Sequence, residues 1–229
     1  MKHTILLGLT TTPGSDWQEK CREIDKYGIE ELALFPTFLG PPDREKLYKL
    51  LQKSSLKSIP HVHLRNDHTD AEIMFFVEKY GTKLFNIHDC GLETMHRLKR
   101  LGLPTYIENG GEISADFEKI LATSNGLCFD FSHFEAHYYR AHEEQCEPFV
   151  SIIDRYKIGC CHVSAVTKEL MKNFDGNYTY SSHKFYQLED LDYVKNYIKY
   201  FSKYVSLELE NSFKQQLEAK AYIEQMIAS

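Results

Sequence analysis

The chain has 229 residues, of which 42% are hydrophobic and 26% are charged, and its formal net charge is -6. This length and composition suit one globular domain, residues 1–229, with enough apolar side chains to fill a core. The acidic balance argues against nucleic acid as a partner, because proteins that bind phosphate backbones are usually basic.

A short apolar run near the N-terminus, residues 5–9, is interpreted as part of the first strand. The run is too short to cross a bilayer and no small-residue cleavage site follows it, so we expect neither a membrane segment nor a secretion signal. The six cysteines form no C-x-x-C pair, which favours reduced thiols in the cytoplasm. Cys128 and Cys160 fall near candidate metal ligands, but burial as small apolar residues is the favoured interpretation.

Strand-like and helix-like segments alternate along the whole chain. This alternation is typical of parallel strand–helix–strand units, and eight units predict a single closed α/β domain, the (β/α)8 or TIM barrel. The predicted strands are residues 5–10, 31–36, 58–65, 83–89, 105–110, 127–132, 159–164 and 205–211.

Helix-start and helix-stop signals separate these strands. In a capping box, two side chains satisfy free backbone amides at a helix N-terminus. This spacing occurs in three pairs: Ser15 with Gln18, Thr69 with Glu72, and Ser212 with Gln215. Glycines stand where three helices are expected to end: Gly28, Gly81 and Gly102.

The stretch of residues 167–188 interrupts the alternation. It is polar and aromatic, contains a glycine and follows the seventh predicted strand. Because barrel enzymes carry working loops after their strand ends, we expect a long loop that covers the site. A mobile insertion without function is the alternative.

Side-chain alternation predicts a polar barrel interior. Phe129 and Leu207 mark outward positions on their strands, so the polar residues beside them face inward. Buried ionisable groups are costly unless they are paired, hydrated or bound to a metal. The inward set is His61, His63, Asn86, His88, Glu108, Cys128, Asp130, His162, Glu208 and Glu210.

These polar groups fall late in their strands, toward the rim where barrels place catalytic residues. Carboxylates with imidazoles suit Mn, Mg, Co or Zn, with zinc favoured as histidines increase. One inward histidine is usually only a hydrogen-bonded core residue, so the convergence of six strands is the signal for a divalent-metal site. By contrast, His137 and His142 are expected on a solvated helix face, and His68 at a polar position before a helix.

Four short motifs, in this chain order, resemble the xylose isomerase-like barrel superfamily. That superfamily holds sugar and sugar-phosphate isomerases and epimerases, and also the endonuclease IV enzymes. The motifs are IENGG with Glu108, FDFSH with Asp130 and His133, CHVSAVTK with His162 and Lys168, and SLELEN with Glu208.

The resemblance implies a role for each motif residue. The implied metal ligands are Glu108, Asp130, His162 and Glu208, with Glu210 as a substitute for Glu208. His133 would stand near the substrate oxygens, and Lys168 at a basic substrate-binding position. The endonuclease branch implies three further metal ligands, His63, His88 and His183, although its Asp-x-His pair reads Ser181-x-His183 here.

The leading hypothesis is a metal-dependent isomerase or epimerase that acts on a small sugar or sugar phosphate. By the family resemblance, the ion would stabilise an enediolate while Glu108 or Glu208 exchanges the proton. Two alternatives stay open: hydrolysis of a phosphodiester or related ester by metal-bound hydroxide, and a non-catalytic barrel. The chain is short for the superfamily, and a homodimer is left open.

Overall fold

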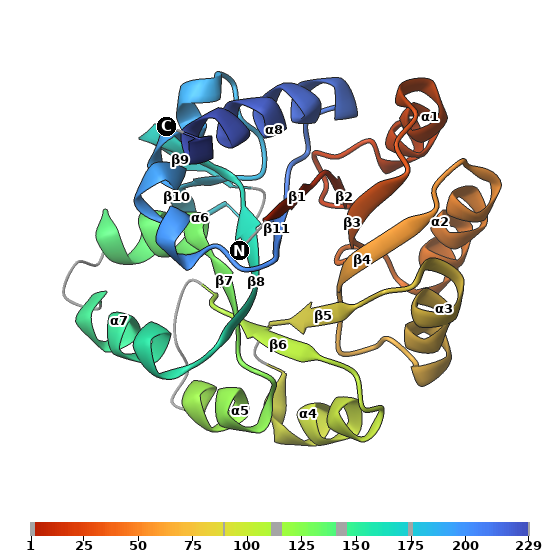
Figure 1. The fold of residues 1–229 in the computed structure, drawn as a ribbon, viewed down its shortest axis with the longest axis horizontal. Helices are drawn as coiled ribbons and strands as arrows, with labels where there is room; N and C mark the ends of the chain where they lie inside the picture. The colour runs from red at the N-terminus through yellow and green to blue at the C-terminus, as the bar shows by residue number, and fades with distance from the viewer. Residues whose placement is uncertain (1–2, 89, 111–115, 141–145, 174–175, 229) are drawn as a thin grey trace.

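The computed structural model describes residues 3–88, 90–110, 116–140, 146–173 and 176–228. Parallel strands surround a central axis and helices lie outside them (Figure 1). His142, one of the predicted surface histidines, and Gly111 of the IENGG motif lie outside the described residues. In the described part of the chain, no helix is long and apolar enough to cross a membrane.

The described strands of the barrel form one parallel sheet. Its order is β1-β11-β8-β7-β6-β5-β4-β3-β2. The strands are β1 (Thr4–Leu6), β2 (Gly8–Thr10), β3 (Glu31–Phe35), β4 (Ser58–His63), β5 (Leu84–Ile87), β6 (Thr105–Glu108), β7 (Leu127–Asp130), β8 (Ile158–Val163) and β11 (Tyr204–Leu207).

The first predicted strand closes the barrel. Its two halves, β1 and β2, are separated only by Leu7, and β1 pairs with β11 while β2 pairs with β3. This close approach needs a glycine, because a Cβ at Gly8 would lie 1.8 Å from the carbonyl oxygen of Leu207. The predicted barrel is confirmed, with its first strand in two segments.

Helices cover the outer face of the sheet (Figure 1). The longer ones are α1 (Trp17–Tyr27), α2 (Pro41–Lys53), α3 (Asp70–Tyr80), α4 (Gly91–Arg100), α5 (Phe117–Thr123), α7 (Cys146–Arg155) and α8 (Phe213–Ala228). A short turn, α6 (Phe131–His133), and a π-helical segment (Phe134–Tyr139) follow β7, and two 3-10 segments (Leu188–Asn196 and Ile198–Tyr200) precede β11.

Two of the three predicted capping boxes are present. The Thr69 side chain accepts from Glu72 N, and Glu72 accepts from Thr69 N in return. The same exchange joins Ser212 and Gln215 at the start of α8. As predicted, glycines in the left-handed conformation end or follow three helices: Gly28, Gly81 and Gly102.

The third capping prediction, Ser15 with Gln18, is wrong. Helix α1 begins one residue later, and its N-cap is Asp16, whose carboxylate accepts from Glu19 N at 2.9 Å. The Ser15 hydroxyl donates instead to the Thr10 carbonyl at 2.9 Å. Two good capping residues stand side by side, and the contact with β2 occupies the first of them.

Apolar side chains fill the lower part of the barrel interior. Four of them, Leu84, Tyr106, Cys128 and Tyr204, are the first or second residue of their strand, so the group forms a floor beneath the rim. Cys128 and Cys160 are fully buried there, in agreement with the favoured interpretation. The floor consists of Leu6, Ala33, Phe35, Leu84, Tyr106, Cys128, Cys160 and Tyr204.

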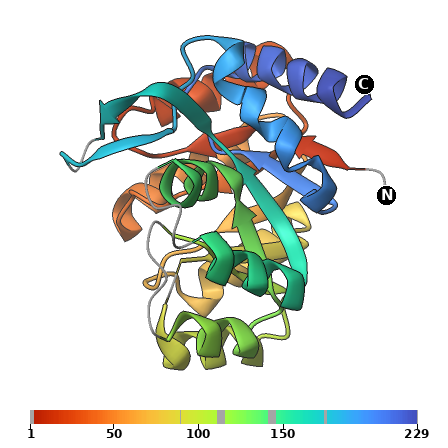
Figure 2. The same ribbon diagram turned by 90° about the vertical axis from the view of Figure 1, so that its left-hand side faces the viewer.

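The segment after β8 is a β-hairpin, where the sequence predicted a loop. Strands β9 (Ala165–Lys172) and β10 (Tyr178–Ser182) pair antiparallel and project beyond the barrel at the upper left of Figure 2. Thr and Tyr residues in this segment favour strands, but their polarity hides the apolar alternation that strand prediction relies on. The turn uses Gly176, which has φ of 85°.

Candidate metal centre

The four ligands implied by the motifs lie together at the rim of the barrel. Glu108 and Asp130 are the last residues of β6 and β7, His162 is next to last in β8, and Glu208 directly follows β11. The parallel register aligns them, since His162 pairs with both Asp130 and Ser206. One donor atom of each residue lies within 4.8 Å of the others.

The His162 imidazole stands among the three carboxylates. Its Nδ1 lies 3.3 Å from Glu108 Oε2, 3.2 Å from Glu208 Oε2 and 4.0 Å from Asp130 Oδ2. All four side chains are buried. The cluster therefore concentrates negative charge in a small volume that is largely shielded from water.

Unpaired donor atoms show that this cluster fits a cation. Glu108 Oε1, Asp130 Oδ2, Glu208 Oε2 and both nitrogens of His162 are buried and have no hydrogen-bond partner among the described residues. Such atoms are normally paired, because an unpaired buried polar group is destabilising. Three carboxylates and one imidazole are a donor set suited to a divalent metal ion.

Local hydrogen bonds fix one oxygen of Asp130 and leave the other available. Asp130 Oδ1 accepts from Ser132 Oγ at 2.6 Å and from His133 N at 2.8 Å. The Asn109 side chain makes two hydrogen bonds to the Asp130 backbone: it accepts from the N–H at 2.8 Å and donates to the carbonyl at 2.9 Å. Sequence reasoning missed Asn109 and Ser132, although both stand inside the quoted motifs.

Electrostatics keep two of the carboxylates ionised. Burial alone would raise the pKa of Glu108, but His162, His88 and His63 hold it well below its usual range. Burial likewise opposes ionisation of Glu208, yet the nearby His162 imidazole, whose Nδ1 lies 3.2 Å from Oε2, lowers its pKa to about 2. Both groups are therefore charged at neutral pH and can attract a cation.

Two further predicted residues, His63 and His88, approach the other side of Glu108. His63 Nε2 lies 2.8 Å from Glu108 Oε2, and His88 Nε2 lies 3.4 Å from Glu108 Oε1. His63 is buried, whereas the His88 side chain is 59% exposed. These three residues form a second group with metal-ligand spacing, and Glu108 belongs to both groups.

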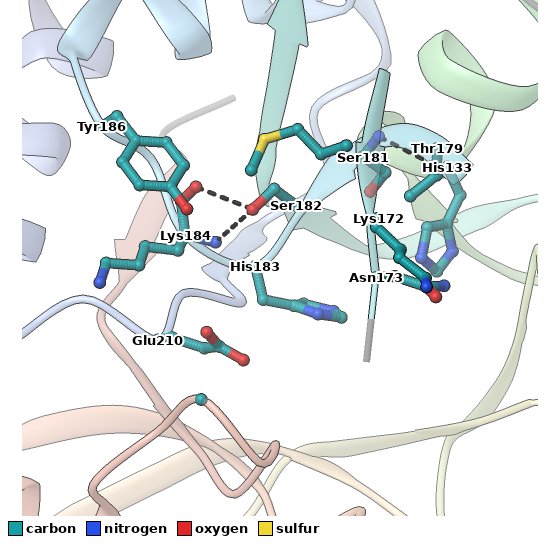
Figure 3. A pocket seen from close by; sticks show the side chains of 12 residues that line it. His133, Lys172, Asn173, Thr179, Ser181, Ser182, His183, Lys184, Tyr186 and Glu210 are labelled. Atoms are coloured by element: carbon teal, nitrogen blue, oxygen red, sulfur yellow. Dashed lines mark hydrogen bonds between the residues drawn. The ribbon is translucent and has the colours of Figure 1, made fainter. Parts of the chain in front are cut away.

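A cavity of about 380 Å³ lies on the hairpin side of the cluster (Figure 3). His133 lines it and places Nδ1 3.8 Å from Asp130 Oδ2, while His183 places Nε2 3.8 Å from Glu208 Oε1. Its other polar lining residues are Lys172, Asn173, Thr179, Ser181, Ser182, Lys184, Tyr186 and Glu210.

Two of the predicted residues lie apart from the four-residue cluster. Glu210 lines the cavity, with its carboxylate against Gly14 and its backbone N–H donating to the His183 carbonyl at 2.6 Å. Lys168 is exposed on β9 and lies outside the described cavity lining, to which the same strand contributes Lys172. Its substrate-binding role stays a prediction.

A second cavity, of about 350 Å³, opens beside His63 and His88. Sequence reasoning did not anticipate it, because its remaining lining, apart from Ile87 of β5, comes from the segments after β3 and β4. These residues include Thr37, Phe38, Arg65, Asn66 and Asp67. Histidines that approach the cluster thus line both cavities: His133 and His183 line the first, and His63 and His88 line the second.

Two solved structures with a similar fold cover nearly the whole chain. An IolI protein with a bound zinc atom has a TM-score of 0.58 and 15% sequence identity over 97% of this chain and 98% of its own. A xylose isomerase domain protein from Planctomyces limnophilus has a TM-score of 0.52 and 11% identity over 98% and 95%. No protein-family model and no curated protein sequence matches the chain. The chain therefore shares its barrel fold with these two proteins.

Proposed function

We propose that this protein is a divalent-metal-dependent isomerase or epimerase of a small sugar or sugar phosphate. The observation that carries the proposal is the cluster of Glu108, Asp130, His162 and Glu208, whose unpaired donor atoms face one another beside a polar cavity. The structurally similar IolI protein has a bound zinc atom, which supports the metal-binding part of the proposal.

The chain's own residues supply the proton chemistry. When bound, a divalent cation would polarise neighbouring substrate oxygens and stabilise the charge that develops on them. Glu108 and Glu208 are ionised and both contact His162, so either carboxylate can accept a proton from a substrate carbon. His133 and His183 border the cavity and can donate hydrogen bonds to substrate hydroxyls.

The hairpin-side cavity suits a small polyhydroxylated substrate. Hydroxyls, an amide, lysines and histidines line it, and its volume of about 380 Å³ lies within the range of small-ligand sites. Lys172 and Lys184 bring positive charge to its wall. A phosphate or carboxylate on the substrate would therefore be tolerated at the end away from the acidic cluster.

A second candidate function is hydrolysis of a phosphate ester. The observation that favours it is the position of His63 and His88, which together with Glu108 offer donor atoms for a second cation beside the first. Paired cations clamp the attacking and leaving oxygens in such reactions. Against this candidate stands Ser181, a hydroxyl where the endonuclease pattern requires a carboxylate ligand.

Solvent deuterium exchange distinguishes the two candidates. Purified protein is incubated in D₂O with Mn or Zn and a panel of neutral aldoses, ketoses and their phosphates, and carbon-bound deuterium is followed by NMR. We expect exchange at the carbon next to the carbonyl, reduced about 100-fold or more in Glu108→Gln because this change removes both a metal ligand and one of the two carboxylates that can act as the base. The exposed variant His96→Ala is the control. Ester cleavage without deuterium uptake would instead support the hydrolase.

A further inference from the structure

Three buried polar side chains lie one layer below the metal cluster and lead to Glu108. Ser206 Oγ is 2.7 Å from His61 Nδ1, His61 Nε2 is 2.8 Å from Asn86 Oδ1, and Asn86 Nδ2 is 2.6 Å from Glu108 Oε2. Each of the three is at most 1% exposed. The contacts cross the barrel from β11 through β4 and β5 to β6.

The position of these residues follows from strand alternation. His61, Asn86 and Ser206 each stand two residues before a residue at the rim, namely His63, His88 and Glu208. Residues two apart on a strand share a face, so the three point inward directly beneath the site.

The Glu108 carboxylate determines the direction of every hydrogen bond in this series of side chains. An ionised carboxylate only accepts, so Asn86 must turn its amide NH₂ toward Glu108 and its carbonyl oxygen toward His61. His61 Nε2 then carries a proton and donates it to Asn86. In the neutral imidazole, Nδ1 accepts from the Ser206 hydroxyl. Every member donates toward Glu108.

Packing alone does not require these polar groups. The corresponding positions two residues before Glu108, Asp130 and His162 hold Tyr106, Cys128 and Cys160, which belong to the apolar floor. Apolar side chains can therefore fill this layer, and a buried polar chain is retained at a desolvation cost. Its one charged end is a candidate metal ligand.

We propose that Ser206, His61 and Asn86 are positioning residues that hold the Glu108 carboxylate in its metal-binding orientation. The Asn86 amide donates to Oε2, the oxygen that also lies 3.3 Å from His162 Nδ1, and thereby fixes the orientation of the carboxylate within the cluster. None of the three lines either described cavity, so they act through Glu108 and have no contact with substrate. The inference rests on the metal centre proposed above.

The test measures divalent-metal affinity in Asn86→Leu, which keeps the branched side-chain shape but removes the donor. We expect Zn and Mn to bind about 10- to 100-fold more weakly, as for other residues that orient metal ligands. His61→Leu, which leaves Asn86 in place, should weaken binding by a smaller factor. The visible spectrum of the cobalt-loaded protein should change in both variants, because the orientation of Glu108 changes.

Asn125→Leu is the matched control. Asn125 accepts from Thr105 N at 2.9 Å near the opposite end of the barrel, so its replacement should lower the melting temperature without weakening metal binding. Wild-type affinity and an unchanged cobalt spectrum in Asn86→Leu and His61→Leu would overturn the proposal. Wild-type protein that binds no divalent ion would instead overturn the metal centre itself. If Asn86→Leu does not fold, the same metal-binding measurement is made on Ser206→Ala, which removes a single hydroxyl. Weaker metal binding would then support the proposal, and wild-type affinity would overturn it.

Discussion

At the scale of single residues, His68 is a buried histidine held in its neutral form. It is fully buried, and its Nδ1 accepts from Arg65 N at 2.8 Å, so this nitrogen carries no proton. Burial, and then the nearby Arg44 charge, lower the pKa of His68 to about 4. The sequence predicted its place just before α3 but gave no sign of its burial, because the helices that cover it are distant in the chain.

The low pKa of His68 makes stability depend on pH. Between about pH 6.5 and 4, His68 becomes protonated in the unfolded chain but stays neutral in the folded chain. The free energy of unfolding therefore falls as the pH falls, by about 3 kcal/mol in total. Urea unfolding at pH 7.5 and pH 5 should show about 2 kcal/mol of this loss in the wild type. The loss should be smaller in His68→Gln, which can still accept from Arg65. Equal losses in both proteins would show that His68 does not contribute.

The family resemblance selected the four-residue cluster from a larger set of inward polar groups, which residue types and strand alternation had predicted. Alternation did not separate Glu208 from Glu210, because both share a face if the strand runs to residue 211. In the structure β11 ends at Leu207, and the chain then turns so that Glu208 joins the cluster and Glu210 lies against Gly14. That turn depends on contacts with other segments, which alternation alone does not reveal.

At the scale of elements, the closing contact between the first and last strands is tied together by α8. The fully buried Gln216 accepts from Gly8 N at 2.7 Å and donates to the carbonyls of Gly8 and Leu209 at 2.9 and 3.0 Å. One side chain thus joins β2 to the segment that carries Glu208. The sequence predicted both strands, but the break between β1 and β2 and the hairpin β9–β10 depend on pairing register, which local patterns do not show.

Gly8→Ala tests the closing contact. The added Cβ would overlap a backbone oxygen, which cannot move without shifting a strand, so we expect the free energy of unfolding to fall by about 3 kcal/mol. Gly40→Ala is the control, since its Cβ would meet only Pro42, at 4.0 Å. Urea unfolding of both variants measures the difference. A Gly8→Ala protein as stable as Gly40→Ala would show that the barrel closes differently.

At the scale of the whole molecule, the barrel gathers charges from distant parts of the sequence at one rim. Glu108 and Glu208 are a hundred residues apart in the chain, yet both contact the His162 imidazole. The apolar floor beneath the cluster limits access of water to these groups from that side. A bound cation would therefore offset the repulsion among three carboxylates and stabilise the fold.

Elemental analysis of purified protein tests the metal centre most directly. The wild type and the control His96→Ala should retain divalent metal after exhaustive dialysis: one ion per chain if the four-residue cluster alone is filled, and two if His63 and His88 hold another. Glu108→Gln and His162→Ala should each lose the ion of the four-residue cluster, because each removes one of its donors. Metal retained at the wild-type level in both variants would contradict the account.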